Sequence, residues 1–280
     1  SDHGCLTSRG CVWVYLWRSF MQTSSFTRYA LRLSYHGLPF SGWQVQPAQR
    51  TVQGELEKAL STLLREQVKV LGAGRTDSGV HAANYVAHVD VATPLDVKDT
   101  LHRLDRFLPT KIAVHEMVEI TDRMHARFSA ESRSYRYVIR RKQNPFGADM
   151  VWTHRRDMDF SLLKRAAEIL LSQTEFAAFA RTGSPVKTTL CNITHASWHQ
   201  EGEEWVFQIR GNRFLRNMVR SLVGTMVELA QGQRDWDNWL SLFDGATRSD
   251  AGQSAPAKGL SFAGVTYPDS PFQSREHAPF

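Results

Sequence analysis

A short glycine-rich segment contains the residues of this chain best suited to chemistry. It places the carboxylate of Asp77 two residues after Arg75, and it reads Gly72-Ala73-Gly74-Arg75-Thr76-Asp77-Ser78-Gly79 before Val80-His81. Glycine lets the backbone turn sharply or pass close to a ligand, and an arginine beside such a loop suits a phosphate group. The segment therefore indicates one reactive carboxylate next to a cation.

Other interpretations of this segment differ in what they require. A dinucleotide-binding turn would have a third glycine where Asp77 stands, and a carboxylate there would repel a pyrophosphate. A phosphate-binding P-loop needs Gly-Lys-Ser/Thr, which the segment lacks. A polar turn between two strands, with Asp77 capping its own backbone, remains the simplest alternative. Only further motifs along the chain argue against that alternative.

The second segment is Phe128-Ser129-Ala130-Glu131-Ser132-Arg133-Ser134-Tyr135-Arg136-Tyr137. On a strand, Tyr135 and Tyr137 share one face and Arg136 lies on the other. Seven cations fall close together here: Arg123, Arg127, Arg133, Arg136, Arg140, Arg141 and Lys142. Such a density suits a phosphate backbone, but lysine and arginine also protect exposed strand edges. Both interpretations stay open.

The third segment is Gly211-Asn212-Arg213-Phe214-Leu215-Arg216-Asn217-Met218-Val219-Arg220. The pattern predicts a long helix over residues 212–231, ended by Gly232. On that helix Arg213, Arg216 and Arg220 share one face. Arginine suits a bidentate grip on carboxylate or phosphate, whereas a solvated charged face is the commoner outcome of this spacing. A fourth segment, Ala255-Pro256-Ala257-Lys258-Gly259-Leu260, precedes the last predicted strand.

These four segments, in this order within residues 28–268, resemble the tRNA pseudouridine synthase A family. The resemblance implies that Asp77 is the essential catalytic residue and that Arg220 pairs with it. It implies that Tyr135 stacks on the target base or ribose and that Leu260 lines the uracil pocket. Arg75 is then the candidate that holds the flipped nucleotide, and the expected RNA contacts are Arg213 and Arg216.

The resemblance also implies an activity. Uridines at tRNA positions 38, 39 and 40, in the anticodon stem-loop, would become pseudouridine by an isomerisation that uses no cofactor and no metal. The expected partners are tRNA and a second copy of the chain in a homodimer. Two other functions stay open: an RNA-binding or chaperone protein that lost turnover, and a synthase that modifies other positions or another RNA. One departure is Asp105, where the family often has asparagine.

The elements that must position these segments follow from the hydrophobic pattern. Strands are predicted over residues 29–35, 68–71, 84–91, 113–120, 133–140, 193–199, 205–209 and 260–267. Helices are predicted after a Thr51 cap and over residues 96–108, 160–171, 212–231 and 236–243. Asp77 then lies on a strand-to-strand connection, where a rigid scaffold displays reactive groups.

An α+β protein follows, with an antiparallel sheet covered on one face by helices. The resemblance implies two ferredoxin-like halves, residues 28–130 and 131–268, whose sheets meet at a central cleft. Residues 1–27 are expected to be an extension outside the fold, and residues 269–280 a flexible tail.

Composition sets broader limits. With 280 residues and 42% hydrophobic content the chain can bury a sizeable core, and its net charge of +6 suits a polyanionic partner. Three cysteines without a C-x-x-C pair favour a reducing compartment, and we expect a cytoplasmic protein. No Cys/His cluster has zinc spacing, and no apolar run reaches the length of a membrane span.

Overall fold

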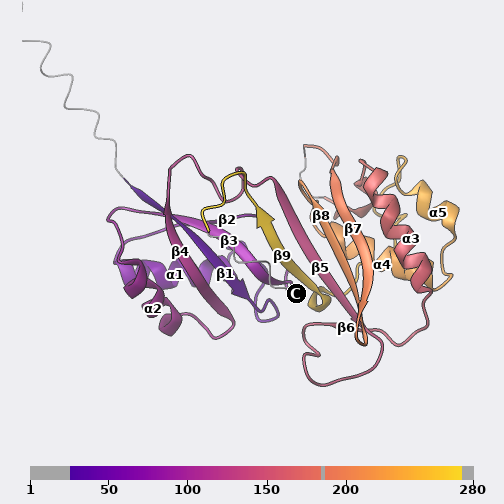
Figure 1. Cartoon of the computed structure of the whole chain (residues 1–280), viewed down its shortest axis with the longest axis horizontal. Coiled ribbons are helices and arrows are strands. Elements are labelled where there is room, and N and C mark those ends of the chain that lie inside the picture. The colour runs from indigo at the N-terminus through magenta and orange to yellow at the C-terminus, as the bar shows by residue number, and fades with distance from the viewer. Residues whose placement is uncertain (1–25, 184–186, 273–280) are drawn as a thin grey trace, which may run out of the picture.

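A computed structural model describes residues 26–183 and 187–272, and its centre is a nine-stranded sheet (Figure 1). Hydrogen-bonded neighbours follow the order β4-β1-β3-β9-β5-β8-β7, with β2 paired to β3 and β6 paired to β5. The strands are β1 (Thr27–Tyr35), β2 (Val70–Gly72), β3 (His81–Val91), β4 (Ile112–Ile120), β5 (Ser132–Arg140), β6 (Trp152–Thr153), β7 (Ile193–Glu201), β8 (Glu204–Gly211) and β9 (Leu260–Thr266).

The last strand, β9, joins the two parts of the sheet. It pairs in parallel with β3 at His81–Ser261 and Ala82–Phe262, and antiparallel with β5 on its other side. Most other pairings are antiparallel, as the sequence predicts, and β5–β6 is parallel. Because the strands form one continuous sheet, the division into two ferredoxin-like halves stays a prediction.

The helices are α1 (Val52–Leu64), α2 (Val97–Phe107), α3 (Phe160–Ile169), α4 (Met218–Ala230) and α5 (Trp236–Ser241). The predicted cap of α1 is confirmed, because Thr51 Oγ1 accepts a hydrogen bond from the backbone N–H of Gly54 at 3.2 Å. Asp96 caps α2 in the same way, accepting from Asp99 N at 3.0 Å.

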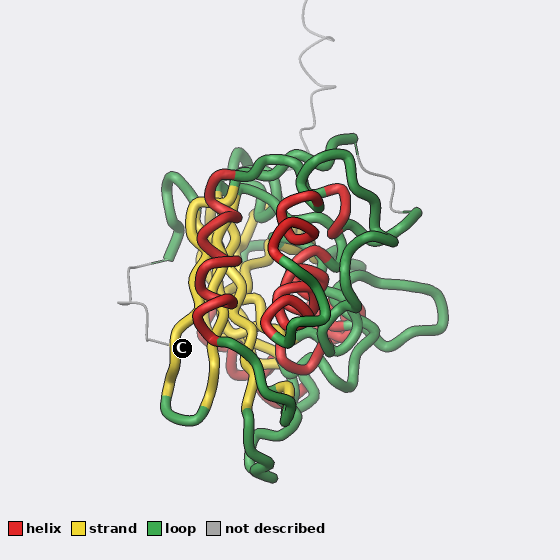
Figure 2. Tube along the Cα trace, turned by 90° about the vertical axis from the view of Figure 1, so that its right-hand side faces the viewer, coloured by secondary structure: helices red, strands yellow, loops and turns green. Residues whose placement is uncertain are grey.

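Two hydrophobic cores lie on the same face of the sheet. One includes residues of α1 and α2 against β1 and β3, and the other includes residues of α3, α4 and α5 against β5, β7 and β8. Figure 2 looks at the molecule from the side of the second group, whose helices lie beside the strands. Tyr135 packs against both cores, while Tyr137 belongs to the second. The face of β5 that contains Tyr135 therefore runs between the two helical groups.

The ends of the fold differ in part from expectation. Strand β1 begins at Thr27, close to the expected start of the fold, and residues 1–25 lie outside the described residues. Phe272, in the expected flexible tail, is instead buried in a small third cluster with Ala30 and Val86. The guanidinium carbon of Arg32 lies over the Phe272 ring, 5.5 Å from its centroid. The packed part of the chain thus extends through Phe272, and residues 273–280 lie outside the described residues.

Helix α4 begins later than the periodicity predicts. Residues 212–217 form a loop, and the helix starts at Met218. Asn217 has φ +66°, a left-handed conformation that interrupts a right-handed helix. The prediction that three arginines share one helical face is therefore wrong: Arg213 and Arg216 lie on the loop, and only Arg220 lies in the helix.

Four cations on β5 and directly after it are paired with carboxylates, although the local sequence contains almost none. The hairpin of β7 and β8 and the segment near residue 157 supply carboxylates that the local sequence does not contain. The pairs are Arg136–Glu201, Arg140–Glu204, Arg141–Asp157 and Lys142–Glu203. These four cations are neutralised by the fold, which argues against the phosphate interpretation for them. The strand-edge interpretation is also wrong, because β5 lies inside the sheet between β9 and β8.

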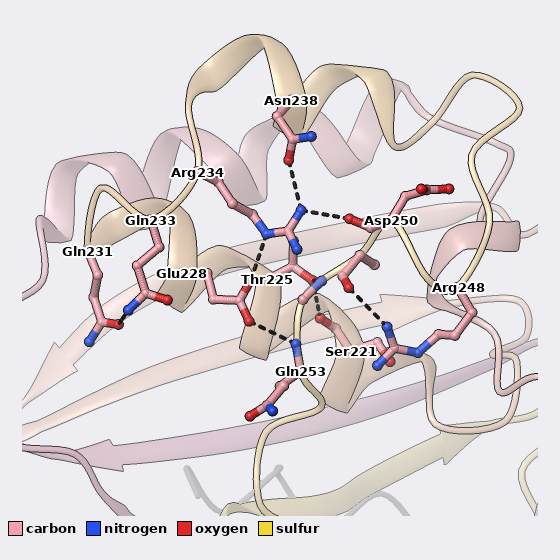
Figure 3. A network of polar contacts seen from close by, with 12 residues as sticks. Ser221, Thr225, Glu228, Gln231, Gln233, Arg234, Asn238, Arg248, Asp250 and Gln253 are labelled. Atoms are coloured by element: carbon pink, nitrogen blue, oxygen red, sulfur yellow. Dashed lines mark hydrogen bonds and ion pairs between the residues drawn. The ribbon is translucent and has the colours of Figure 1, made fainter.

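A polar network fastens the segment between α4 and β9 (Figure 3). The guanidinium of Arg234 donates to Glu228 at 2.6 Å, to Asn238 at 2.8 Å and to the carbonyl oxygen of Asp250 at 2.6 Å. Glu228 in turn accepts from the backbone N–H of Gln253 at 2.8 Å. This network holds residues 250–253 against α4, and so sets the position of the segment that leads into Leu260.

Candidate active site

The glycine-rich segment forms the connection between β2 and β3, as the sequence predicts. Its end is a tight turn in which the N–H of Val80 donates to the carbonyl oxygen of Asp77 at 3.1 Å. Gly79 has φ +79° in this turn, a conformation that side chains other than glycine disfavour. The Asp77 side chain is 22% exposed, so it remains accessible to a ligand.

A second loop, residues 36–43, is hydrogen-bonded to the backbone of this connection. The N–H of Trp43 donates to the carbonyl oxygen of Thr76 at 3.2 Å, and the N–H of Gly79 donates to that of Phe40 at 3.3 Å. Gly42 adopts φ +86°, and a Cβ atom at this position would lie 2.4 Å from the Thr76 oxygen. The supporting loop therefore needs glycine at the point of closest approach.

Two buried tyrosines of the sheet form hydrogen bonds with the same connection. Tyr35 Oη lies 2.8 Å from Thr76 Oγ1, and the Tyr85 hydroxyl donates to the carbonyl oxygen of Gly74. Burial raises the pKa of Tyr35 and of Tyr85, so both stay neutral hydroxyl groups. These contacts hold Gly74 and Thr76, the residues on either side of Arg75, against β1 and β3.

The cation beside Asp77 is Arg216. Its Nε atom lies 3.5 Å from Asp77 Oδ1, and its side chain is 56% exposed. The expected pair with Arg220 is not formed, because Arg220 Nε donates to the carbonyl oxygen of Ala255 at 2.7 Å. The loop before α4 brings Arg216 to the carboxylate, whereas the helix directs Arg220 to the segment before β9.

Tyr135 lies between the two helical groups and near Asp77. Its ring packs edge-on against Phe214 at 5.0 Å and against Phe262 at 5.2 Å between centroids. Burial, and then the negative charge of Asp77, raises the pKa of Tyr135, so this group is a neutral phenol at pH 7. Asp77, Arg216 and Tyr135 therefore converge from three separate parts of the chain.

The other predicted site residues lie in different surroundings. Leu260 is buried and pairs with Tyr137 across β9 and β5, and the Tyr137 hydroxyl donates to the carbonyl oxygen of Pro256 at 2.8 Å. Arg75 is exposed and has no hydrogen-bond or ion-pair partner among the described residues. Arg213 is half-buried and lowers the pKa of Cys191, although burial dominates and raises that pKa to about 11.

Arg133 has a role that the sequence did not indicate. Its guanidinium donates to Ala73 at 3.2 Å and to Ala130 and Asn212 at 3.0 Å each, always to backbone carbonyl oxygens, and also to that of Arg127. This side chain thus ties together the glycine-rich loop that contains Asp77, the β4–β5 turn and the loop before α4. An arginine in a cationic stretch gives no sign of carbonyl partners so distant in the chain.

His81, directly after the loop, is a structural histidine. Its Nδ1 atom accepts from Gly37 N at 3.0 Å, and its Nε2 atom lies 3.2 Å from the carbonyl oxygen of Lys258. Burial, then the nearby His36, lowers the pKa of His81 to about 4. His88 on β3 is similar: its Nδ1 accepts from Ala126 N at 3.1 Å, and burial lowers its pKa to about 4.

These two histidines predict acid sensitivity. In the folded state both stay neutral below the ordinary histidine pKa of about 6.5, so the unfolded chain binds protons first as the pH falls. We expect their contribution to stability to be complete above pH 6.5 and lost towards pH 4, by about 2 kcal/mol from each. Urea unfolding of the wild type and of His88→Gln at pH 7.5 and pH 4.5 measures this. An equal loss of stability in both proteins would contradict the assignment to His88.

Within the described ranges, no three or more His, Cys, Asp or Glu side chains are grouped so that they could hold a metal ion. No helix in the same ranges is both long and apolar enough to cross a membrane.

Comparison with known proteins identifies the family of this chain. The chain matches the tRNA pseudouridine synthase family over residues 33–129 and 166–268. It is 42% identical to the tRNA pseudouridine synthase A of Parabacteroides distasonis, over 88% of this chain and 98% of that protein. The enzymes of the same name from Bacteroides fragilis and Rippkaea orientalis are 41% and 39% identical, over 89% and 90% of this chain and 100% and 87% of their own lengths. This chain therefore belongs to the tRNA pseudouridine synthase A family.

Proposed function

We propose that the protein converts uridines at positions 38, 39 and 40 of tRNA to pseudouridine, with Asp77 as the essential residue. The observation that supports this most is the convergence of Asp77 and Arg216, from two loops, with Tyr135 of β5; Arg216 Nε lies 3.5 Å from Asp77 Oδ1. A carboxylate beside a cation and a partly buried phenol is a suitable site for a uridine, which offers both a ribose and an aromatic base.

The reaction balances without an oxidant or reductant. The N1–C1′ bond of uridine breaks, the uracil rotates, and a C5–C1′ bond forms; the proton on C5 leaves and N1 gains one. The Asp77 carboxylate serves by attacking C1′ of the ribose or C6 of the uracil, or by stabilising positive charge at the ribose as the bond breaks. Tyr135, a neutral phenol beside it, packs on the base and is placed to exchange a proton at the ribose.

A stacked base in a stem must first leave the helix, which costs a few kcal/mol. Arg75 is exposed and unpartnered among the described residues, two positions before Asp77. It is therefore placed to occupy the gap that the flipped nucleotide leaves. Leu260 is assigned to the wall of the uracil pocket, and Arg213 to contact with the RNA backbone.

The test is pseudouridine mapping on one unmodified tRNA with uridines at positions 38, 39 and 40, incubated with the protein and no added cofactor. Pseudouridine at these positions supports the proposal. If pseudouridine formed only at other positions of the tRNA, the assignment to positions 38, 39 and 40 would be wrong. Binding of tRNA without any product would favour an RNA-binding protein that lost turnover.

Arg216 should contribute to both chemistry and binding. Arg216→Ala removes the cation beside Asp77, and we expect a tenfold or so lower single-turnover rate together with a smaller salt dependence of tRNA affinity. Arg213→Ala also removes one positive charge, but at a position that does not contact Asp77. It should therefore weaken tRNA binding while the single-turnover rate stays unchanged. Equal single-turnover rates in the two variants would exclude Arg216 from the chemical step.

We further propose that the enzyme acts in the cytoplasm as a homodimer in which one tRNA contacts both subunits. Light scattering on the purified protein, with and without tRNA, measures this state directly. A monomer in both conditions would contradict it.

A further inference from the structure

The turn between β4 and β5, residues 121–131, displays an exposed aromatic ring. Phe128 is 77% exposed, although burying a phenylalanine is usually favourable by a few kcal/mol. A disordered loop would explain such exposure simply, but this turn is densely hydrogen-bonded. The fold therefore holds the ring in solvent, which points to a ligand.

Hydrogen bonds within the turn hold its backbone. The N–H groups of Arg127 and Phe128 both donate to His125 Nδ1, at 3.1 and 3.3 Å. The N–H of His125 donates to Ser129 Oγ at 2.9 Å, and the N–H of Ser129 returns to the His125 carbonyl oxygen at 3.0 Å. The base of the turn is also fixed, because the Tyr267 hydroxyl donates to the carbonyl oxygen of Ala126 at 2.7 Å.

Three rings form a series from the sheet to the surface. The centroids of His88 and His125 lie 4.6 Å apart, and those of His125 and Phe128 lie 4.4 Å apart with an interplanar angle of 35°. His88 is buried, whereas Phe128 is exposed. The outermost ring is thus supported from below by a partly buried ring.

The charges around this ring suit a polyanion. Arg127 places its guanidinium 5.7 Å from the Phe128 ring centroid, and Arg123 lies on the same turn. Both arginines are exposed, and neither forms an ion pair with a described residue. They differ in this from the paired cations Arg136 and Arg140 on β5. An aromatic ring beside unpaired cations is the arrangement that binds single-stranded nucleic acid.

The turn is also connected to the catalytic loop. Arg133 donates to the carbonyl oxygens of Arg127 and Ala130 in the turn, and to that of Ala73 in the loop that presents Asp77. One guanidinium therefore fixes the position of the exposed ring relative to the catalytic carboxylate.

We propose that Phe128, flanked by Arg127, is a stacking platform for an unpaired base of the tRNA that enters the active site. The proposal rests on the proposed function for its ligand, and it adds a residue that binds a base other than the isomerised uridine. The cation neutralises phosphate, while the ring accepts any base face, so the platform orients the anticodon arm with little sequence preference.

Phe128→Ala tests the platform, with Phe146→Ala as the matched control, because Phe146 is 83% exposed on a different loop. Affinity is measured with an unmodified tRNA transcript by fluorescence anisotropy. We expect Phe128→Ala to weaken binding roughly tenfold without changing the salt slope, Phe128→Trp to restore it, and Phe146→Ala to have no effect. Arg127→Ala should reduce the salt slope.

Stacking itself is read from 2-aminopurine placed singly at each anticodon-loop position of the same transcript. Wild type should quench the fluorescence at one position, and Phe128→Ala should abolish that quenching. Unchanged affinity and unchanged quenching in Phe128→Ala would overturn the proposal. If light scattering showed that the wild type is a homodimer and Phe128→Ala a monomer, the proposal would also be overturned, because the ring would then belong to a subunit contact. The two proposals can fail separately. If the wild type makes no pseudouridine but Phe128→Ala still weakens tRNA binding, the proposed activity is refuted and the stacking platform is supported.

Discussion

Asp77→Asn is expected to abolish pseudouridine formation, by about a thousandfold or more in the single-turnover rate. The substitution keeps the size of the side chain but removes the charge that the proposed reaction needs at C1′ or C6. Binding of tRNA should persist, because contacts to phosphate supply most of the affinity of such proteins for nucleic acid. Pseudouridine mapping and anisotropy on the same tRNA measure the two properties separately.

The matched control is Asp105→Asn, which removes the same charge from an exposed position on α2. It also places at this position the asparagine that the family often has. We expect this variant to retain the wild-type rate, so that a loss in Asp77→Asn cannot come from net charge alone. Normal turnover by Asp77→Asn would remove the carboxylate from the mechanism.

Gly42→Ala is expected to have the second largest effect, although residue 42 does not touch the substrate site. Alanine disfavours the observed φ of +86°, and its Cβ atom would lie 2.4 Å from the Thr76 carbonyl oxygen. That oxygen belongs to the backbone next to Asp77 and cannot rotate away, so the glycine-rich loop must move. A displacement of about 1 Å in a catalytic group can lower a rate about a hundredfold.

We therefore expect Gly42→Ala to lose about a hundredfold in rate and about 2–3 kcal/mol in free energy of unfolding. Gly264→Ala on β9 is the control, since a Cβ atom there makes only ordinary contacts, the nearest at 3.4 Å to Ser134 Oγ. Rates are compared well below the melting temperature of each variant, with circular dichroism to verify folding. Full activity in Gly42→Ala would mean that the loop at residues 36–43 does not position Asp77.

The sequence by itself determined the local features of this protein. The alternation of β5 correctly placed Tyr135 and Tyr137 on one face, and Thr51 was correctly identified as a helix cap. The position of Asp77 on a connection between two strands was also correct. These features depend on side-chain periodicity and on hydrogen bonds between residues a few positions apart, so the order of residues specifies them. The family, likewise, was recognisable from short motifs in a fixed order.

Only the tertiary structure decided which of these residues meet. The partner of Asp77 is Arg216 because Asn217, with φ +66°, delays the start of α4 and leaves a loop that reaches the carboxylate. Arg133 binds backbone carbonyl oxygens of three separate segments, and the insertion of β9 between β3 and β5 brings Phe262 against Tyr135. Such contacts join residues far apart in the chain, and their geometry depends on how both helical groups pack on one sheet. Local patterns contain no information on that packing, and the arginine beside Asp77 is not the one that the family resemblance implied.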